Sequence, residues 1–67
     1  MAEVDALKAE IRKLNARATD LKMALHDLSE ELPAAWEQIP DVAQRTYDAF
    51  RTLAAKRAEL KALETAS

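Results

Sequence analysis

A chain of 67 residues with ten basic and twelve acidic side chains, for a net charge of −2, is at most one small domain and buries little core by itself. The absence of cysteine excludes disulfides and thiolate metal sites built from this chain alone, and the absence of glycine excludes phosphate-cradling glycine loops. No apolar run approaches the roughly 20 residues that cross a bilayer, and the charged start of the chain lacks the apolar stretch of a signal peptide, so we expect a cytoplasmic protein without a membrane partner.

The first half of the chain carries an unbroken heptad repeat of apolar residues, in which the spacing alternates between three and four positions. Such a repeat is typical of an amphipathic helix that packs along one face. It predicts a helix over residues 2–32, about 45 Å long at about 1.5 Å per residue. Pro33 ends this helix, because proline removes a hydrogen-bond donor and pushes the preceding residue out of helical geometry. The repeat consists of Val4, Leu7, Ile11, Leu14, Ala18, Leu21, Leu25, Leu28 and Leu32.

A short connection bracketed by two prolines, PAAWEQIP, follows at residues 33–40. After it, Asp41 has the position of an N-cap, and Gln44 lies three residues later, where its side chain can complete a capping box. We therefore expect a second helix over residues 41–63.

The apolar stripe of the second helix is looser than that of the first, because Lys56 and Arg57 interrupt it. Short connections between helices favour antiparallel neighbours, so the predicted fold class is all-α, a single antiparallel two-helix hairpin over residues 1–67. Two helices cannot enclose a core. A homodimer that forms a four-helix bundle, or a dimer of such dimers, would cover the open apolar face. Tyr47 and Phe50 are expected to pack near the turn, as core or rim. The stripe consists of Val42, Thr46, Ala49, Phe50, Leu53, Leu60 and Leu63.

A second stripe of side chains lies on the face of the first helix that is opposite the heptad repeat. His26 and Glu30, four residues apart, place an imidazole nitrogen beside a carboxylate, and Asp27 offers a further oxygen. These three candidate ligands suit a divalent transition metal such as Ni, Zn or Fe, with water or a second chain completing the site. The alternative is an ordinary solvent-exposed helix surface. The stripe consists of Met23, His26, Asp27 and Glu30.

The residues from Asp27 to Asp41 include five acidic side chains and no basic one, so one end of the molecule is expected to be acidic. This end is either a solvated charged surface or a docking site for a cation or a basic partner. Trp36, the only tryptophan, either folds back over the end of the bundle as a hydrophobic plug or contacts a partner. The candidate partner-docking residues are Glu31, Trp36 and Glu37.

Three stretches resemble the Rop-like family of small helical proteins encoded in nitrogen-fixation gene clusters: KLN at 13–15, LKMALHDLSEELPAAW at 21–36 and VAQRTYDAF at 42–50. The resemblance covers most of the chain. It implies antiparallel helical hairpins that associate, metal binding in some members, and a role alongside nitrogenase or in the maturation of its cofactor. It implies no enzymatic activity. The residues that match the family pattern are Met23, His26, Asp27, Leu32, Pro33, Trp36 and Tyr47.

Catalysis and RNA binding are both disfavoured by the residues themselves. Ser29 lies three residues after His26, but the backbone donors inside a helix are occupied and cannot form an oxyanion hole. The apolar heptad repeat argues against the inward-pointing carboxylates of a di-iron bundle. Basic residues of the first helix can form a basic face, but the negative net charge and the scarcity of stacking aromatic residues argue against nucleic-acid binding.

The sequence and the resemblance together predict a non-catalytic accessory protein of nitrogen fixation. In this hypothesis the protein is a homo-oligomer that binds a divalent metal and acts with a maturation protein on nitrogenase or its metal cofactor. The alternative is a structural coiled-coil adaptor that docks a protein partner through its acidic turn region, without metal. An RNA-binding helical bundle is the third hypothesis.

Overall fold

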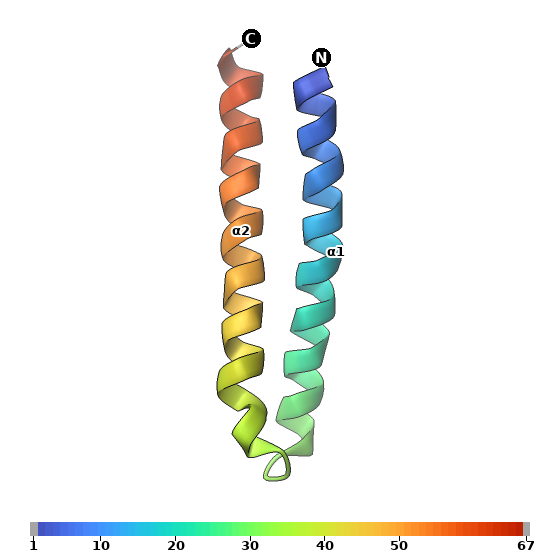
Figure 1. Ribbon diagram of the computed structural model, residues 1–67, viewed down its shortest axis with the longest axis vertical. Coiled ribbons are helices and arrows are strands. Elements are labelled where there is room, and N and C mark those ends of the chain that lie inside the picture. Colours follow the sequence, from blue (N-terminus) through green and yellow to red (C-terminus); the bar gives the residue numbers. More distant parts are fainter. Residues whose placement is uncertain (1, 67) are drawn as a thin grey trace.

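The protein forms two long antiparallel helices joined by a tight turn, as seen in a computed structural model that describes residues 2–66 (Figure 1). Helix α1 covers Ala2–Glu31, a short 3₁₀ helix η1 covers Trp36–Gln38, and helix α2 covers Ile39–Ala66. The two ends of the chain lie together at one end of a rod about 51 Å long, and the turn forms the opposite end. The all-α hairpin is therefore confirmed, and residues 2–66 contain no strand. Met1 and Ser67, which the predicted hairpin includes, lie outside the described residues.

The heptad repeat of α1 faces α2, as predicted. Leu7, Ala18 and Leu28 are buried, and they are spaced along the whole length of the helix. At the middle of the hairpin, Ala18 packs with Ala49 and Leu53 of α2, and three further residues of the repeat pack against this cluster, namely Ile11, Leu14 and Leu21. Alanine at facing positions lets the two helices approach closely. The exception within the repeat is Leu32, which follows the end of α1 and is exposed.

Polar contacts between the helices occur where Lys56 and Arg57 interrupt the apolar stripe of α2. The Lys56 Nζ atom lies 3.6 Å from Glu10 Oε1 of α1, and Arg57 Nη2 donates a hydrogen bond of 3.1 Å to Asn15 Oδ1. Nearer the turn, the Thr46 hydroxyl lies 3.4 Å from the Leu21 carbonyl of α1, and it also donates within α2 to the Val42 carbonyl at 2.8 Å. The interrupted part of the stripe therefore remains packed against α1, and charged and amide side chains bridge the two helices there.

The turn is tightly structured. The Ala34 amide donates to the Glu31 carbonyl and the Gln38 amide donates to the Ala35 carbonyl, each at 3.0 Å. Pro33 follows the end of α1, as predicted, and the Leu32–Pro33 peptide bond is cis. Ala35 has φ 58° and ψ 21°, which is the left-handed conformation. This conformation costs a residue with a Cβ atom about 1–2 kcal/mol.

Helix α2 begins at Ile39, two residues before the expected start, so Asp41 lies in its first turn and is not the N-cap. The predicted capping box is wrong. The Gln44 amide group donates forward to Asp48 Oδ1 at 3.0 Å instead of reaching back, and Asp41 Oδ2 lies 3.2 Å from Arg45 Nε. The physical reason is that Pro40 is tolerated in the first turn of a helix, where its missing amide hydrogen has no intrahelical acceptor.

The hairpin leaves much of its surface uncovered. Its solvent-accessible surface is 5176 Å², whereas a compact monomer of the same mass exposes about 4,200 Å². Large apolar side chains remain exposed on both helices and on the turn. Neither α1 nor α2 contains a stretch that is long and apolar enough to span a membrane.

Candidate functional site

His26 and Glu30 are brought together on the outer face of α1. The His26 Nε2 atom lies 2.9 Å from Glu30 Oε1, and the two side chains are 60% and 69% exposed. Helical spacing explains the contact, because residues four apart lie one turn above each other. As an exposed pair it adds little to stability. Chemically, it presents one imidazole nitrogen and one carboxylate to a common point outside the helix.

Asp27, the third predicted ligand, does not join this pair. Adjacent residues on a helix point about 100° apart at 3.6 residues per turn, so Asp27 faces a different direction from His26. Within residues 2–66, no group of three or more histidine, aspartate and glutamate side chains is gathered in a way that could hold a metal ion. One chain therefore offers two ligands at this position, and a four-coordinate ion would need water or a second chain to complete its shell.

Ser29 does not form a nucleophile–base pair with His26. Its hydroxyl donates a 2.6 Å hydrogen bond to the backbone carbonyl of His26. The imidazole contacts Glu30 instead. The arrangement places these residues in helix-surface interactions and provides no activated hydroxyl.

Three exposed apolar residues with acidic neighbours in the sequence lie at the turn and the start of α2. We call them the turn-end surface: Leu32, Trp36 and Ile39, flanked by Glu31 and Glu37. Trp36 is 62% exposed, so within this single chain the prediction that it folds back as a hydrophobic plug is wrong. Trp36 is the first residue of η1 and follows Ala35, which has the left-handed conformation. Burying the exposed part of a tryptophan is worth about 3 kcal/mol, which the isolated hairpin does not gain.

The aromatic residues of α2 are likewise outside the intramolecular core. Tyr47 and Phe50 are both exposed, at 62% and 42%. Within this single chain, neither residue packs in the core, so the part of the expectation that placed them there is incorrect. Tyr47 follows Thr46, which faces α1. Successive side chains on a helix are rotated by about 100°, so the Tyr47 side chain is turned away from α1.

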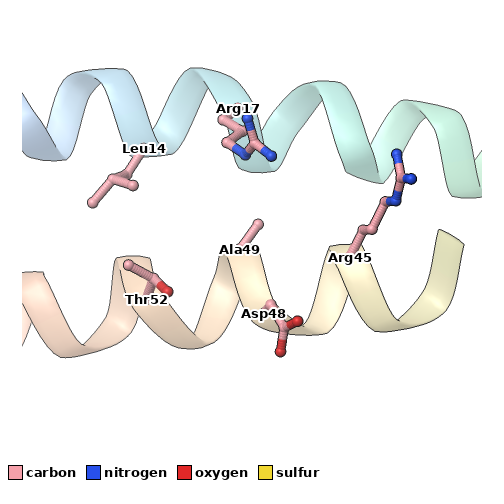
Figure 2. A pocket seen from close by; sticks show the side chains of 6 residues that line it. All are labelled: Leu14, Arg17, Arg45, Asp48, Ala49 and Thr52. Carbon is pink, nitrogen blue, oxygen red and sulfur yellow. The ribbon is translucent and has the colours of Figure 1, made fainter. Parts of the chain in front are cut away.

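A hollow between the helices, which the sequence pattern did not indicate, lies midway along the hairpin (Figure 2). Arg17 comes from α1 and Arg45 from α2, and the Arg45 side chain extends toward α1. Arg45 pairs with Asp41, which lies outside the hollow, and Asp48 accepts a hydrogen bond from Gln44. Its volume is about 210 Å³, and it is lined by Leu14, Arg17, Arg45, Asp48, Ala49 and Thr52.

Comparisons with a family model and with individual relatives identify the same family. The model of the Rop-like family matches residues 2–65. A UPF0437 protein of Azorhizobium caulinodans is 53% identical over 64 residues, which are 96% of this chain and 93% of the relative. A Frankia alni relative, described as a UPF0437 protein in the nifX–nifW intergenic region, is 53% identical over 49 residues, which are 73% of this chain and 60% of the relative.

Two solved structures have the same fold. An NMR structure of a structural-genomics target is 51% identical with a TM-score of 0.86, and the match covers 91% of this chain and 86% of that one. A crystal structure of a DUF683-family protein from the cyanobacterium Cyanothece 51142 is 42% identical with a TM-score of 0.86, covering 88% of this chain and 97% of that one. The chain therefore belongs to the Rop-like family of UPF0437 proteins, one of which is encoded between nifX and nifW.

Proposed function

We propose that this protein is a non-catalytic accessory protein of nitrogen fixation, which acts in the cytoplasm by binding other molecules during maturation of nitrogenase or its metal cofactor. The observation that carries the proposal is the position of the Frankia alni relative in the nifX–nifW intergenic region. That relative shares 53% of its residues with this chain over the matched segment. Genes in such clusters commonly serve one process, so the link supports a role in nitrogen fixation.

A binding role is supported by the chemistry of the exposed side chains. Nucleophilic catalysis requires a hydroxyl or thiol beside a base, with an orienting group behind that base. Here the Ser29 hydroxyl donates a hydrogen bond to the backbone carbonyl of His26. The His26 imidazole contacts the Glu30 carboxylate on the outer face of α1. These contacts favour surfaces that associate over a site that performs a reaction.

The working form in this proposal is a homo-oligomer built from helical hairpins lying side by side. The support is the exposed area: the chain exposes 5176 Å², roughly 1,000 Å² more than a compact monomer of its mass. A standard protein interface covers about 800 Å² on each partner. A second hairpin packed along the helices would cover an area of this size and complete a four-helix bundle.

Metal handling is the second candidate function, and the His26–Glu30 contact of 2.9 Å favours it. An imidazole and a carboxylate at this separation are two acceptable ligands for divalent Ni, Zn or Fe. In an oligomer, a second chain can supply the same two ligands. The adaptor hypothesis, in which the acidic turn docks a protein partner without metal, needs neither ligand and remains the alternative.

The proposal is tested by deleting the gene in a bacterium that carries it and grows on dinitrogen. We expect slower growth on dinitrogen and lower acetylene reduction, with normal growth on ammonium and restoration of both by the intact gene. If a gene carrying His26→Ala restores fixation fully, the accessory role stands, but metal handling by His26 is not part of it. Unchanged fixation in the deletion strain under limiting and replete metal supply would contradict the proposal.

A further inference from the structure

We propose that the turn-end surface docks a basic segment of another protein, one that presents lysine or arginine side chains around an apolar pocket for the Trp36 indole. The inference rests on the proposed function, because it names the kind of partner that an accessory protein of this shape can bind. The surface consists of Leu32, Trp36 and Ile39 with Glu31 and Glu37, as defined above.

The apolar part of this surface lies at the tip of the rod. The turn connects the ends of α1 and α2 and forms one end of the molecule (Figure 1). Leu32, Trp36 and Ile39 are all exposed there, within eight consecutive residues. Hairpins that associate side by side cover the flanks of the two helices, so the tip remains available. Tryptophan contributes strongly to protein interfaces when a partner buries it.

The charges around the apolar residues are unusually one-sided. Residues 27–41 contain five acidic side chains and no basic one. Asp41 pairs with Arg45, and Glu30 contacts His26. Within the described part of the chain, Glu31 and Glu37 take part in no ion pair, so both carboxylates are free to pair with a partner. A basic partner is attracted to this end, and lysine or arginine can form charge-assisted hydrogen bonds to the two carboxylates.

The surface is also held in shape before any partner arrives. Two backbone hydrogen bonds of 3.0 Å cross the turn, one from Ala34 to Glu31 and one from Gln38 to Ala35. Trp36 begins the short helix η1 between them. An ordered turn loses little conformational entropy on binding, which favours affinity.

A second copy of this chain is the competing occupant, and charge argues against it. Two turn-end surfaces facing each other would bring Glu31 and Glu37 of one chain against the same carboxylates of the other, and like charges repel. An arginine or lysine of a different protein can instead contact the carboxylates and also stack on the indole face.

The test uses the full-length protein and the fluorescence of Trp36, its only tryptophan. The probe is a synthetic helical peptide of lysine and leucine with one apolar face, and the control peptide replaces each lysine by glutamate. We expect a blue shift of the Trp36 emission with the lysine peptide only, and an affinity that falls as salt is added. Absence of a shift with the lysine peptide, or equal shifts with both peptides, would overturn the proposal.

Matched variants separate docking at this surface from general charge attraction. Glu31→Gln/Glu37→Gln and Glu3→Gln/Asp5→Asn each remove two negative charges, the first at the turn and the second in the first turn of α1 at the opposite end. By calorimetry, we expect the turn variant and Trp36→Ala to raise the Kd of the lysine peptide at least tenfold, and Glu3→Gln/Asp5→Asn to change it less than twofold. Equal losses in both double variants would overturn the proposal.

Self-association is measured in the same samples without peptide. A blue shift of Trp36 that grows with protein concentration and is lost in Glu31→Gln/Glu37→Gln would show that a second copy occupies the surface, and would overturn the proposal. The outcomes are independent of the gene-deletion experiment. If the deletion strain loses nitrogen fixation but the peptide does not bind, only the basic partner is ruled out. If the peptide binds but the deletion strain fixes nitrogen normally, only the proposed function is ruled out.

Discussion

The amine of Lys56 on α2 lies 3.6 Å from the carboxylate of Glu10 on α1, at a position of α2 that otherwise belongs to the apolar stripe. Lys56 follows Leu53 by three residues and precedes Leu60 by four, which is the heptad spacing. Its side chain is 32% exposed, and a second carboxylate, Glu59, lies 3.6 Å away on the same helix. The lysine therefore occupies a half-buried core position with both ion pairs near the surface.

Lys56→Leu is expected to raise the free energy of unfolding by about 1 kcal/mol. The reason is that burying a leucine at a half-buried site gains about 1–2 kcal/mol, while two partly exposed ion pairs contribute less than about 1 kcal/mol together. Urea denaturation at one protein concentration measures the change, since oligomerisation would otherwise shift it. Lys61→Leu, at an exposed position, is the control and should change stability by less than about 0.5 kcal/mol. A less stable Lys56→Leu protein would show that the ion pairs outweigh burial.

Ala35→Gly is expected to stabilise the hairpin by about 0.5 kcal/mol. Ala35 is the one non-glycine residue with positive φ among residues 2–66. Glycine removes the left-handed penalty of about 1–2 kcal/mol. It also raises the entropy of the unfolded chain, which costs about 0.5–1 kcal/mol of stability. Ala34→Gly, next to it at negative φ, gains no such relief and should destabilise by about 0.5–1 kcal/mol. Thermal unfolding followed by circular dichroism compares the two, and equal effects of the two glycines would contradict the role assigned to the Ala35 conformation.

The heptad repeat predicted the intramolecular face of α1 correctly because helical periodicity is a local property of the sequence. Leu7, Ala18 and Leu28 are buried where the repeat placed them. The sequence places the start of α2 two residues too late because Asp41 resembles an N-cap, whereas Ile39 and Pro40 already belong to the helix. A proline is compatible with both a connection and a first helical turn, so the pattern alone cannot distinguish them.

Specific contacts between the two helices do not follow from the spacing of residues within each helix. The Arg57–Asn15 hydrogen bond joins residues 42 positions apart, and it depends on the register that the turn imposes on the two helices. The hollow between Arg17 and Arg45 arises in the same way. At the candidate site, the His26–Glu30 contact is predictable from one-turn spacing, whereas the exposure of Trp36 depends on how the turn folds, which residue spacing does not specify.

Ala18→Leu is expected to destabilise the hairpin by about 1–3 kcal/mol. Ala18 is 1% exposed and packs with Ala49 and Leu53 of α2 in the core between the helices. Extra methyl groups there force the helices apart or require strained rotamers. Ala16→Leu places the same side chain on the exposed face of α1, so its effect should be within about 0.5 kcal/mol of zero. Urea denaturation of both variants tests the contrast, and tolerance of leucine at Ala18 would mean that the helix separation adapts without cost.

Metal binding by His26 and Glu30, if it is part of the function, should depend on these two residues and not on Asp27. We expect the untagged protein, loaded with Ni²⁺, Zn²⁺ or Fe²⁺ and passed through gel filtration, to retain one ion per two chains, because each chain brings two ligands together. His26→Ala should abolish retention and Glu30→Gln should weaken it at least tenfold, whereas Asp27→Asn should retain the metal, since Asp27 faces another direction. Elemental analysis of the eluted protein measures all four samples.

Wild-type protein that elutes without metal after loading with each of the three ions would rule out metal handling by this pair. Retention that survives His26→Ala would likewise assign the metal to other residues. In either case His26 and Glu30 form only an exposed contact one turn apart, of a kind that contributes about 0.3–0.5 kcal/mol to a helix when both groups are charged. Such a contact would stabilise the last turns of α1 next to the turn-end surface, and the adaptor hypothesis would then account for the exposed residues of this end of the molecule.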